Sequence, residues 1–287
     1  MIANKYEIKE DIKKGAFGTI SKGIHVRKGE LVAIKREYGD LQTLKHEVKI
    51  MNYLATSKVK QIPEIFYYGS FENHPCLVFT LYECSLYDYM RHKEITIEHM
   101  NILMIKMLNI FINIHKAYVV HRDIKPQNFM IKNGDIFLID FGLATFFVDE
   151  TGSHYANRES DTIVGTPIFV SIHIHKGSRY CCRDDLIYLG SLYLYMTEHA
   201  FWIPESQDFS SDLPLTSLKH PYNMELEKNK SYENMRRGLS QSPHTKSIYK
   251  YMDYVYSLDY GETPKYIPLQ HVFYSGSEGT TFEMVST

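Results

Sequence analysis

The chain has 287 residues, of which 44% are hydrophobic and 23% are charged, an ordinary composition for a globular protein. This length allows one large domain or two lobes. The formal net charge of −2 excludes a basic field along the whole chain, so we expect no direct nucleic-acid partner and no membrane partner.

Cysteine spacing and the first residues bear on the cellular compartment. The four cysteines form no zinc-type cluster and indicate a reduced interior. The opening MIANKYEIKEDI has no apolar segment like that of a signal peptide. The longest apolar stretches, Ile102–Ile114 and Leu186–Met196, are interrupted or too short for a transmembrane helix. We expect an intracellular protein, in the cytoplasm or the nucleus.

Strand patterns fill most of the first 80 residues. Turns are expected at Lys14-Gly15 and at Lys28–Glu30, and one helix at about Asp40–Ala55. The apolar stripe of that helix is expected to consist of Leu41, Leu44, Val48, Met51 and Ala55. The expected strands are Tyr6–Ile12, Thr19–Val26, Leu31–Arg36, Pro63–Tyr68 and Pro75–Thr80.

Helical patterns dominate after Ser85. Arg183–Thr197 is apolar around its whole circumference and should be buried. The segment 204–247 is rich in polar residues and predicts loops with one amphipathic helix. The final residues, 276–287, are expected to form a tail. The expected helices are Ile97–Lys116, Arg183–Thr197, about Asn223–Arg237, and Ile248–Leu258 as the last one. The pattern predicts an α+β chain: a small sheet lobe followed by a larger helical lobe.

A hairpin is predicted where FMIK and DIFLID flank Asn133-Gly134. This turn sets Asn128 opposite Ile139, so Asp140 should lie beside Asn128 at the open end. Amide and carboxylate oxygens suit Mg²⁺, which takes its other ligands from water and phosphate. The sequence therefore predicts a metal site formed by Asn128 and Asp140.

Two charged residues precede the hairpin. Asp123 could orient a hydroxyl group and accept its proton, and Lys125 could balance the charge of a phosphoryl group in transfer. Each residue alone could be a solvated polar end of a hairpin. Together they complete the pattern H-R-D-x-K-x-x-N followed by D-F-G, which is a specific protein-kinase signature.

A second set of residues would hold the nucleotide. Val32–Lys35 reads VAIK and places Lys35 on a predicted strand. Glu47 follows twelve residues later, about 60° from Leu44 on the helical wheel, at the edge of the apolar stripe. It either reaches out to water or forms an ion pair that aims Lys35 at the phosphates.

The segment Ile12–Ile20 reads as an incomplete glycine-rich loop. Gly15 and Gly18 let backbone N–H groups approach phosphate. Lys13 stands where the first glycine of such a loop is usual. It could stiffen the start of the loop or add a cation near the nucleotide, and the sequence leaves both open.

Taken together, these motifs resemble those of eukaryotic-type protein kinases. Ser171-Ile172-His173 after Gly165-Thr166, and Arg183–Gly190, are similar to the casein-kinase-1 group, with some likeness to vaccinia-related kinases. The resemblance covers about Tyr6 to Phe273. It implies a bilobal fold with an N-lobe at 1–79, a hinge at 80–85 and a C-lobe at 86–275.

The resemblance implies a role for each matching residue. Asp123 would be the catalytic base, Lys125 would steady the γ-phosphate, and Lys35 and Glu47 would form the activating pair. Asp185 would hold the backbone of the catalytic loop, although a carboxylate there also suits a helix N-terminus. Phe79 would be the gatekeeper and Thr80, Leu81 and Tyr82 the hinge. The expected nucleotide contacts, some of which could equally be plain core, are Ile12, Gly15, Gly18, Ile20, Ala33, Lys35, Phe79, Thr80, Tyr82 and Ile139.

One departure from the group concerns substrate choice. Many casein-kinase-1 members carry an arginine two residues after the Gly-Thr pair, where it grips a phosphate already on the substrate. This chain has Ile168 there. Four other cations could rebuild an anion site or form a solvated face: Arg158, Lys176, Arg179 and Arg183.

Regulation can also be read from this region. Arg122 could bind a phosphorylated residue of the following segment. The candidates in that segment are Thr145, Thr151, Ser153, Tyr155, Ser160 and Thr162.

Three functions follow from these observations. The first is a serine/threonine protein kinase of casein-kinase-1 type that uses ATP and Mg²⁺ and acts, as a monomer, on protein substrates that include acidic ones. The second is a pseudokinase that binds nucleotide or protein partners without useful turnover, suggested by Lys13 and Ile168. The third is a small-molecule kinase on the same fold.

Overall fold

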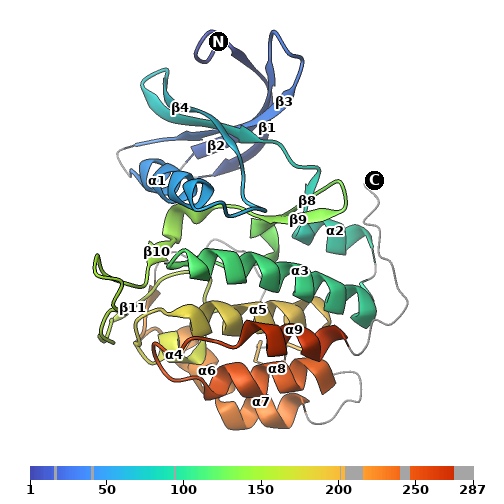
Figure 1. The fold of residues 1–287 in the computed structure, drawn as a ribbon, viewed down its shortest axis with the longest axis vertical. Helices are drawn as coiled ribbons and strands as arrows, with labels where there is room; N and C mark the ends of the chain where they lie inside the picture. Colours follow the sequence, from blue (N-terminus) through green and yellow to red (C-terminus); the bar gives the residue numbers. More distant parts are fainter. Residues whose placement is uncertain are drawn as a thin grey trace.

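The computed structural model describes residues 1–15, 18–39, 42–93, 95–200, 202–203, 216–239 and 246–274. A five-stranded antiparallel sheet with the strand order β1-β2-β3-β5-β4 forms the upper lobe in Figure 1. Its strands are β1 (Tyr6–Gly15), β2 (Gly18–His25), β3 (Leu31–Glu37), β4 (Ile65–Phe71) and β5 (His74–Thr80). The strand-rich beginning predicted from the sequence is confirmed.

The first strand is longer than predicted. Lys14 pairs with Thr19 and Gly15 with Gly18, so the turn expected at Lys14-Gly15 is wrong, because these residues continue the ladder. The turn expected at Lys28–Glu30 is confirmed, with Gly29 at a φ of 73°.

The helix α1 (Thr43–Thr56) packs beside this sheet. It begins where the buried Glu37 carboxylate accepts hydrogen bonds from the backbone N–H groups of Thr43 and Leu44, at 3.1 and 3.3 Å. The predicted residues Asp40 and Leu41 lie outside the described residues. Ala55 is exposed and Leu54 is buried instead.

The lower lobe in Figure 1 is mainly helical. Its helices are α2 (Leu86–His92), α3 (Ile97–Lys116), α4 (Ile172–His175), α5 (Cys182–Met196), α6 (Pro221–Asn229), α7 (Tyr232–Leu239), α8 (Lys246–Ser257) and α9 (Tyr266–Tyr274). Its short strands are β6 (Cys84–Ser85), β7 (Val119–Val120), β8 (Phe129–Lys132), β9 (Asp135–Leu138), β10 (Thr145–Phe146), β11 (Thr162–Ile163) and β12 (Thr216–Ser217). Two 3₁₀ turns flank the β8–β9 hairpin, η1 (Pro126–Asn128) and η2 (Phe141–Leu143).

The helix α5 runs through the centre of this lobe. Every one of its residues except Tyr195 is buried, as its apolar composition predicted. The long helix α3 lies against α5 and α9. The bounds predicted for this helix, Ile97–Lys116, are confirmed. By length and composition α3 is apolar enough to cross a membrane, so the expectation that the stretch Ile102–Ile114 is too short for that is wrong; more than half of the helix's residues are buried inside this lobe.

Two helical predictions are wrong. The single helix expected at Asn223–Arg237 is split into α6 and α7 at Lys230-Ser231. Ile248–Leu258 is not the last helix, because α9 follows it. The expected tail at 276–287 lies outside the described residues.

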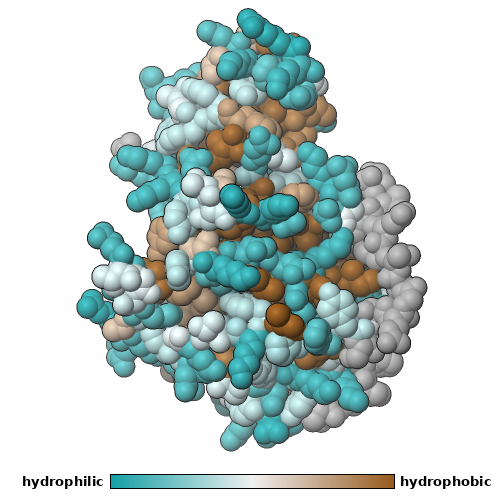
Figure 2. All heavy atoms as spheres, in the orientation of Figure 1, coloured by the Kyte–Doolittle hydropathy of each residue, from teal (hydrophilic) through white to brown (hydrophobic). Residues whose placement is uncertain are grey.

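The connection between the lobes lies between the end of β5 at Thr80 and the start of α2 at Leu86. The residue limits proposed for the lobes remain a prediction. On the face drawn in Figure 2, hydrophilic residues cover most of the surface and apolar residues appear in small patches between them.

Candidate functional site

The hairpin predicted around Asn133-Gly134 is present. Both turn residues have positive φ values, 51° and 74°, as a tight two-residue turn between antiparallel strands requires. The backbone N–H of Ile139 donates to the carbonyl of Asn128 at 2.9 Å, which confirms the predicted register. The hairpin β8–β9 lies directly below the sheet lobe (Figure 1) and places Asn128 and Asp140 at its open end.

Asp123 lies at the centre of a buried hydrogen-bond cluster. Its Oδ2 atom contacts the Lys125 ammonium at 2.9 Å and accepts a hydrogen bond from the Asn128 amide at 3.0 Å. Its Oδ1 atom accepts a hydrogen bond from the Thr166 hydroxyl at 2.7 Å. Three of the residues predicted from the sequence therefore meet, together with Thr166.

Asp185 holds the loop that leads to Asp123. Its carboxylate accepts hydrogen bonds from the backbone N–H groups of His121 and Arg122, at 2.8 and 3.0 Å, and from the His115 ring at 3.0 Å. Because α5 is buried and fixed, this carboxylate ties the catalytic loop to the core. Of the two interpretations of Asp185, the geometry fits the first.

The predicted ion pair between Lys35 and Glu47 is formed, with a distance of 2.7 Å between Nζ and Oε2. Lys35 also lies 3.3 Å from Asp140. Glu47 is 4% exposed, so it does not reach out to water. Lys35 thus joins the helix α1 of the upper lobe to the end of the hairpin.

These contacts determine the protonation states of Lys35 and Asp140. Burial opposes the charge of Lys35, but the carboxylates of Asp140 and Glu47 outweigh it and raise the pKa of the amine. The Lys35 ammonium in turn lowers the pKa of Asp140 to about 2. Both groups are therefore ionised at neutral pH.

Asn128 and Asp140 fit a magnesium ion that is shared with phosphates. The Asn128 amide nitrogen is occupied by Asp123, which leaves the amide oxygen as a ligand. The ionised Asp140 side chain is 42% exposed. Within the described ranges, no cluster of three or more His, Cys, Asp or Glu residues could hold a metal by itself. This suits an ion that takes its other ligands from water and a nucleotide.

The predicted contacts for the base of the nucleotide come from facing strands. Ala33 pairs with Phe79 in the sheet, and both are buried. The Tyr82 ring packs against Phe137 of the hairpin, with 5.0 Å between the ring centroids. The predicted contacts that are half-buried are Ile20, Thr80, Leu81 and Ile139.

Ile12 differs from the other predicted apolar contacts. It lies at a bulge of β1, between Asp11 and Lys13, and is 55% exposed. Lys13 is also exposed, and it pairs with Ile20 in the ladder.

The two glycines of the loop, Gly15 and Gly18, differ in how much space a side chain would have. A Cβ atom on Gly18 would lie 2.1 Å from the carbonyl oxygen of Arg36, so β3 alone requires glycine there. A Cβ atom on Gly15 would have open space around it, with the nearest backbone atom 4.0 Å away. Of the two, Gly15 is the one for which close approach of a phosphate remains the explanation.

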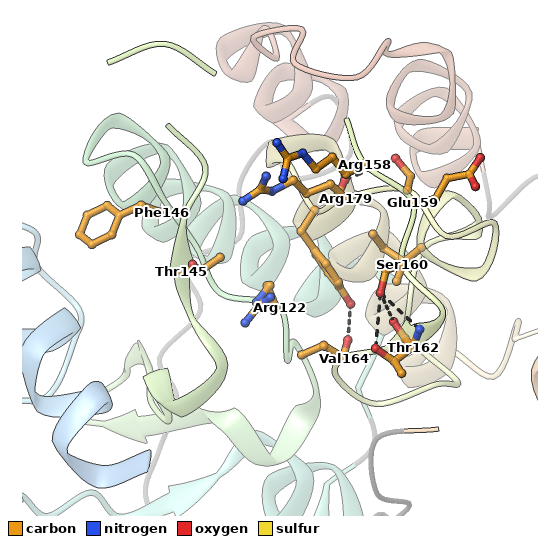
Figure 3. Close-up of a pocket in the computed structure, with 12 residues that line it drawn as sticks. Arg122, Thr145, Phe146, Arg158, Glu159, Ser160, Thr162, Val164 and Arg179 are labelled. Carbon is orange, nitrogen blue, oxygen red and sulfur yellow. Dashed lines mark hydrogen bonds between the residues drawn. The ribbon is translucent and has the colours of Figure 1, made fainter. Parts of the chain in front are cut away.

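A pocket of about 330 Å³ lies beside the segment that follows Asp140. Arg122, Arg158 and Arg179 line it, as Figure 3 shows, and Ser160 and Thr162 lie at the same pocket. Arg158 and Arg179, two of the four cations predicted to form an anion site, therefore line this pocket together with Arg122. Lys176 and Arg183 are not among the lining residues.

The two cations outside the pocket have other surroundings. Arg183 is buried, and its guanidinium donates to the carbonyl of Leu258 at 3.0 Å. Lys176 is exposed. Ile168, which replaces the arginine of the casein-kinase-1 group, is 9% exposed and offers no charge.

Two contributing residues were not singled out as site residues from the sequence. Thr166 was used as a family marker only, although its position next to Gly165 is a usable signal. A Cβ atom on Gly165 would lie 2.3 Å from the Arg122 carbonyl, so this glycine lets the segment approach the catalytic loop. His121 donates to the Ile139 carbonyl at 3.0 Å and packs against Phe141, which links the loop to the hairpin.

The comparisons with known proteins agree with this geometry. A protein kinase domain model matches residues 6–253. The chain is 30% identical over 280 residues to casein kinase I homolog 2 of Schizosaccharomyces pombe, covering 93% of this chain and 61% of that protein. It is 30% identical over 286 residues to casein kinase I homolog 1 of the same organism, covering 93% and 60%. The chain thus spans about three fifths of the length of these curated relatives. On its match over most of the sequence and its bilobal architecture, the chain belongs to the protein kinase domain family.

Proposed function

We propose that this chain is an ATP-dependent serine/threonine protein kinase of casein-kinase-1 type. The observation that supports this best is the Asp123 carboxylate, which accepts a hydroxyl hydrogen bond from Thr166 at 2.7 Å while Lys125 and Asn128 hold its other oxygen. A substrate serine or threonine would need the same contact from a hydroxyl group to Asp123.

Each residue of the site has a separate role in the proposed phosphoryl transfer. Asp123 orients the substrate hydroxyl and accepts its proton, and Lys125 beside it offsets negative charge on the transferred group. Lys35, held by Glu47, would contact the α- and β-phosphates of a bound nucleotide. Asn128 and Asp140 would hold the magnesium ion. Bound Mg-ATP would supply the transferable γ-phosphate and the metal charge that screens it.

Protein substrates are favoured over small molecules. The loop Thr166–Val170 starts beside Asp123, where the half-buried Thr166 bonds to the carboxylate, and its other four residues are buried. A polypeptide would approach Asp123 past Thr166. The adjacent pocket is lined by three arginines and one carboxylate, Glu159, and its excess of positive charge would attract acidic or phosphorylated segments of such a peptide. We propose that acidic sites are preferred, and that the pocket partly replaces the charge missing at Ile168.

The test is a Mg-ATP assay on casein with wild type, Asp123→Asn and Asp140→Asn. Wild type should phosphorylate serine or threonine, and each variant should lose about 10³-fold or more in kcat. An inactive wild type that still binds nucleotide would refute the kinase and favour a pseudokinase. Full activity of Asp123→Asn would refute the assignment of the base.

Profiling of wild type on a peptide library tests the substrate class. Enrichment of acidic or phosphorylated residues near the acceptor serine is expected. A library profile that does not depend on charge would contradict the role of the arginine pocket.

A further inference from the structure

The loop Pro167–Val170 begins right after Thr166, whose hydroxyl bonds to the catalytic carboxylate of Asp123. Its four residues are buried, so the loop would act on a substrate through the position that it gives to Thr166. Two side chains donate hydrogen bonds to three carbonyl groups of this loop. Lys230 donates to the carbonyls of Pro167 and Val170, at 2.9 and 2.6 Å, and the Trp202 indole donates to the carbonyl of Ile168 at 2.7 Å.

Lys230 is an unusual residue at this place. It lies between α6 and α7 and is 2% exposed. Among the described residues it forms no ion pair, and its remaining polar neighbour is the His175 ring at 3.4 Å. Removing a lysine amine from water is costly unless it is hydrogen-bonded, and here the loop carbonyls provide the bonds.

Pure stability does not require a lysine in this position. Burial without an opposite charge lowers the pKa of the Lys230 amine well below its usual value, so this side chain costs stability that an apolar residue of similar size would not cost. What an apolar residue could not do is fix two carbonyls of one loop at a set separation. The exposure of 2% also excludes direct contact between the Lys230 amine and a bound substrate.

We infer that Lys230, assisted by Trp202, is a positioning residue for the protein substrate: it holds the buried loop Pro167–Val170, and with it Thr166, in the shape that allows a peptide to bind beside Asp123. This inference rests on the proposed protein kinase activity. It deepens that proposal by assigning peptide binding to a buried clamp below the loop, separate from the residues that bind the nucleotide.

The experiment compares wild type with Lys230→Met, which keeps the apolar stem and removes the amine. Lys228→Met is the matched control, because Lys228 is exposed at the end of α6, two residues before Lys230. For an acidic serine peptide, Lys230→Met should raise KM about tenfold and leave the KM for ATP within about twofold. Lys228→Met should leave both constants unchanged. An unchanged peptide KM, or an equal change in both KM values, would overturn the inference.

Two further measurements keep the inference testable. Trp202→Phe removes one hydrogen bond and keeps a ring, so it should give a smaller change of the same kind. If Lys230→Met fails to fold and Trp202→Phe behaves as wild type, the role is structural and the inference is wrong. If wild type proves inactive, the proposed function fails by itself, and the affinity of each variant for the labelled peptide gives the same comparison. Equal affinities would then refute the clamp.

Discussion

Replacement of Asp185 by asparagine tests how the catalytic loop is held. The Asp185 carboxylate is fully buried and accepts three N–H donors: from Arg122 at one oxygen, and from His121 and His115 at the other. An asparagine has one acceptor oxygen. In its better orientation it keeps the two donors at that oxygen and turns its own NH₂ group toward the N–H of Arg122.

The size of the effect follows from these contacts. Loss of one hydrogen bond to a charged acceptor costs about 2 kcal/mol, and each of the two remaining bonds weakens by about 1 kcal/mol when the acceptor becomes neutral. The sum is about 4 kcal/mol, within the range of about 3–5 kcal/mol for breaking a buried charge pair. For a chain of this size that corresponds to a fall in Tm of about 7 °C. A shift of the Asp123 loop by about 1 Å would lower kcat about 100-fold.

The assays are urea denaturation and steady-state kinetics on Asp185→Asn. Asp253→Asn serves as the control, because Asp253 is a helix carboxylate whose side chain is 41% exposed and whose partners, Arg236 and Tyr232, are on the surface. The control should lose less than about 1 kcal/mol of unfolding free energy. If Asp185→Asn also lost less than about 1 kcal/mol and kept its kcat, the loop would not depend on this anchor and the reasoning would be refuted.

Two other predictions concern single charges. Glu47→Gln removes one of the two carboxylate partners of Lys35, so the KM for ATP should rise about tenfold in steady-state assays, and an unchanged KM would contradict the pairing. Burial opposes the charge of His115, but Cys182 and Asp185 raise its pKa to about 10, above the usual value of 6.5. Because the folded pKa is the higher one, charged His115 stabilises the fold fully below pH 6.5, and this contribution disappears as the pH rises through about 10. The difference in unfolding free energy between wild type and His115→Gln in urea melts should therefore shrink from pH 6 to pH 10; a constant difference would count against a charged His115.

Local sequence patterns were sufficient where neighbouring residues decide the structure. Asn133-Gly134 alone sets the turn and the register of the hairpin, because few other residues adopt its two positive φ values. The helix α5 was predicted because its apolar residues leave no polar face to turn toward water. The placement of Asp123, Lys125 and Asn128 together follows from their spacing around this hairpin.

Long-range contacts explain the errors. The break between α6 and α7 lies at Lys230, whose amine is bound to carbonyls some 60 residues earlier in the chain, and no pattern within residues 223–237 shows that. The helix α9 was missed because it contains Pro268 and buries only Leu269 and Phe273. A proline in the first turn of a helix is tolerated, since its missing N–H would have no partner there.

The contact between Thr166 and Asp123 was also missed because it is long-range. The two residues are 43 positions apart, and the loop reaches Asp123 because Gly165 lets its backbone pass close to Arg122. The sequence predicted which acid would act, but the partners of that acid depend on how the whole lobe is packed.

The Thr166 hydroxyl has a consequence for the resting protein. It satisfies the oxygen of Asp123 that a reacting hydroxyl would need. A lone water molecule gains no advantage by displacing it, whereas a serine within a polypeptide brings the binding energy of its neighbours. Under the function proposed above, this contact would disfavour transfer of phosphate to water relative to transfer to a polypeptide.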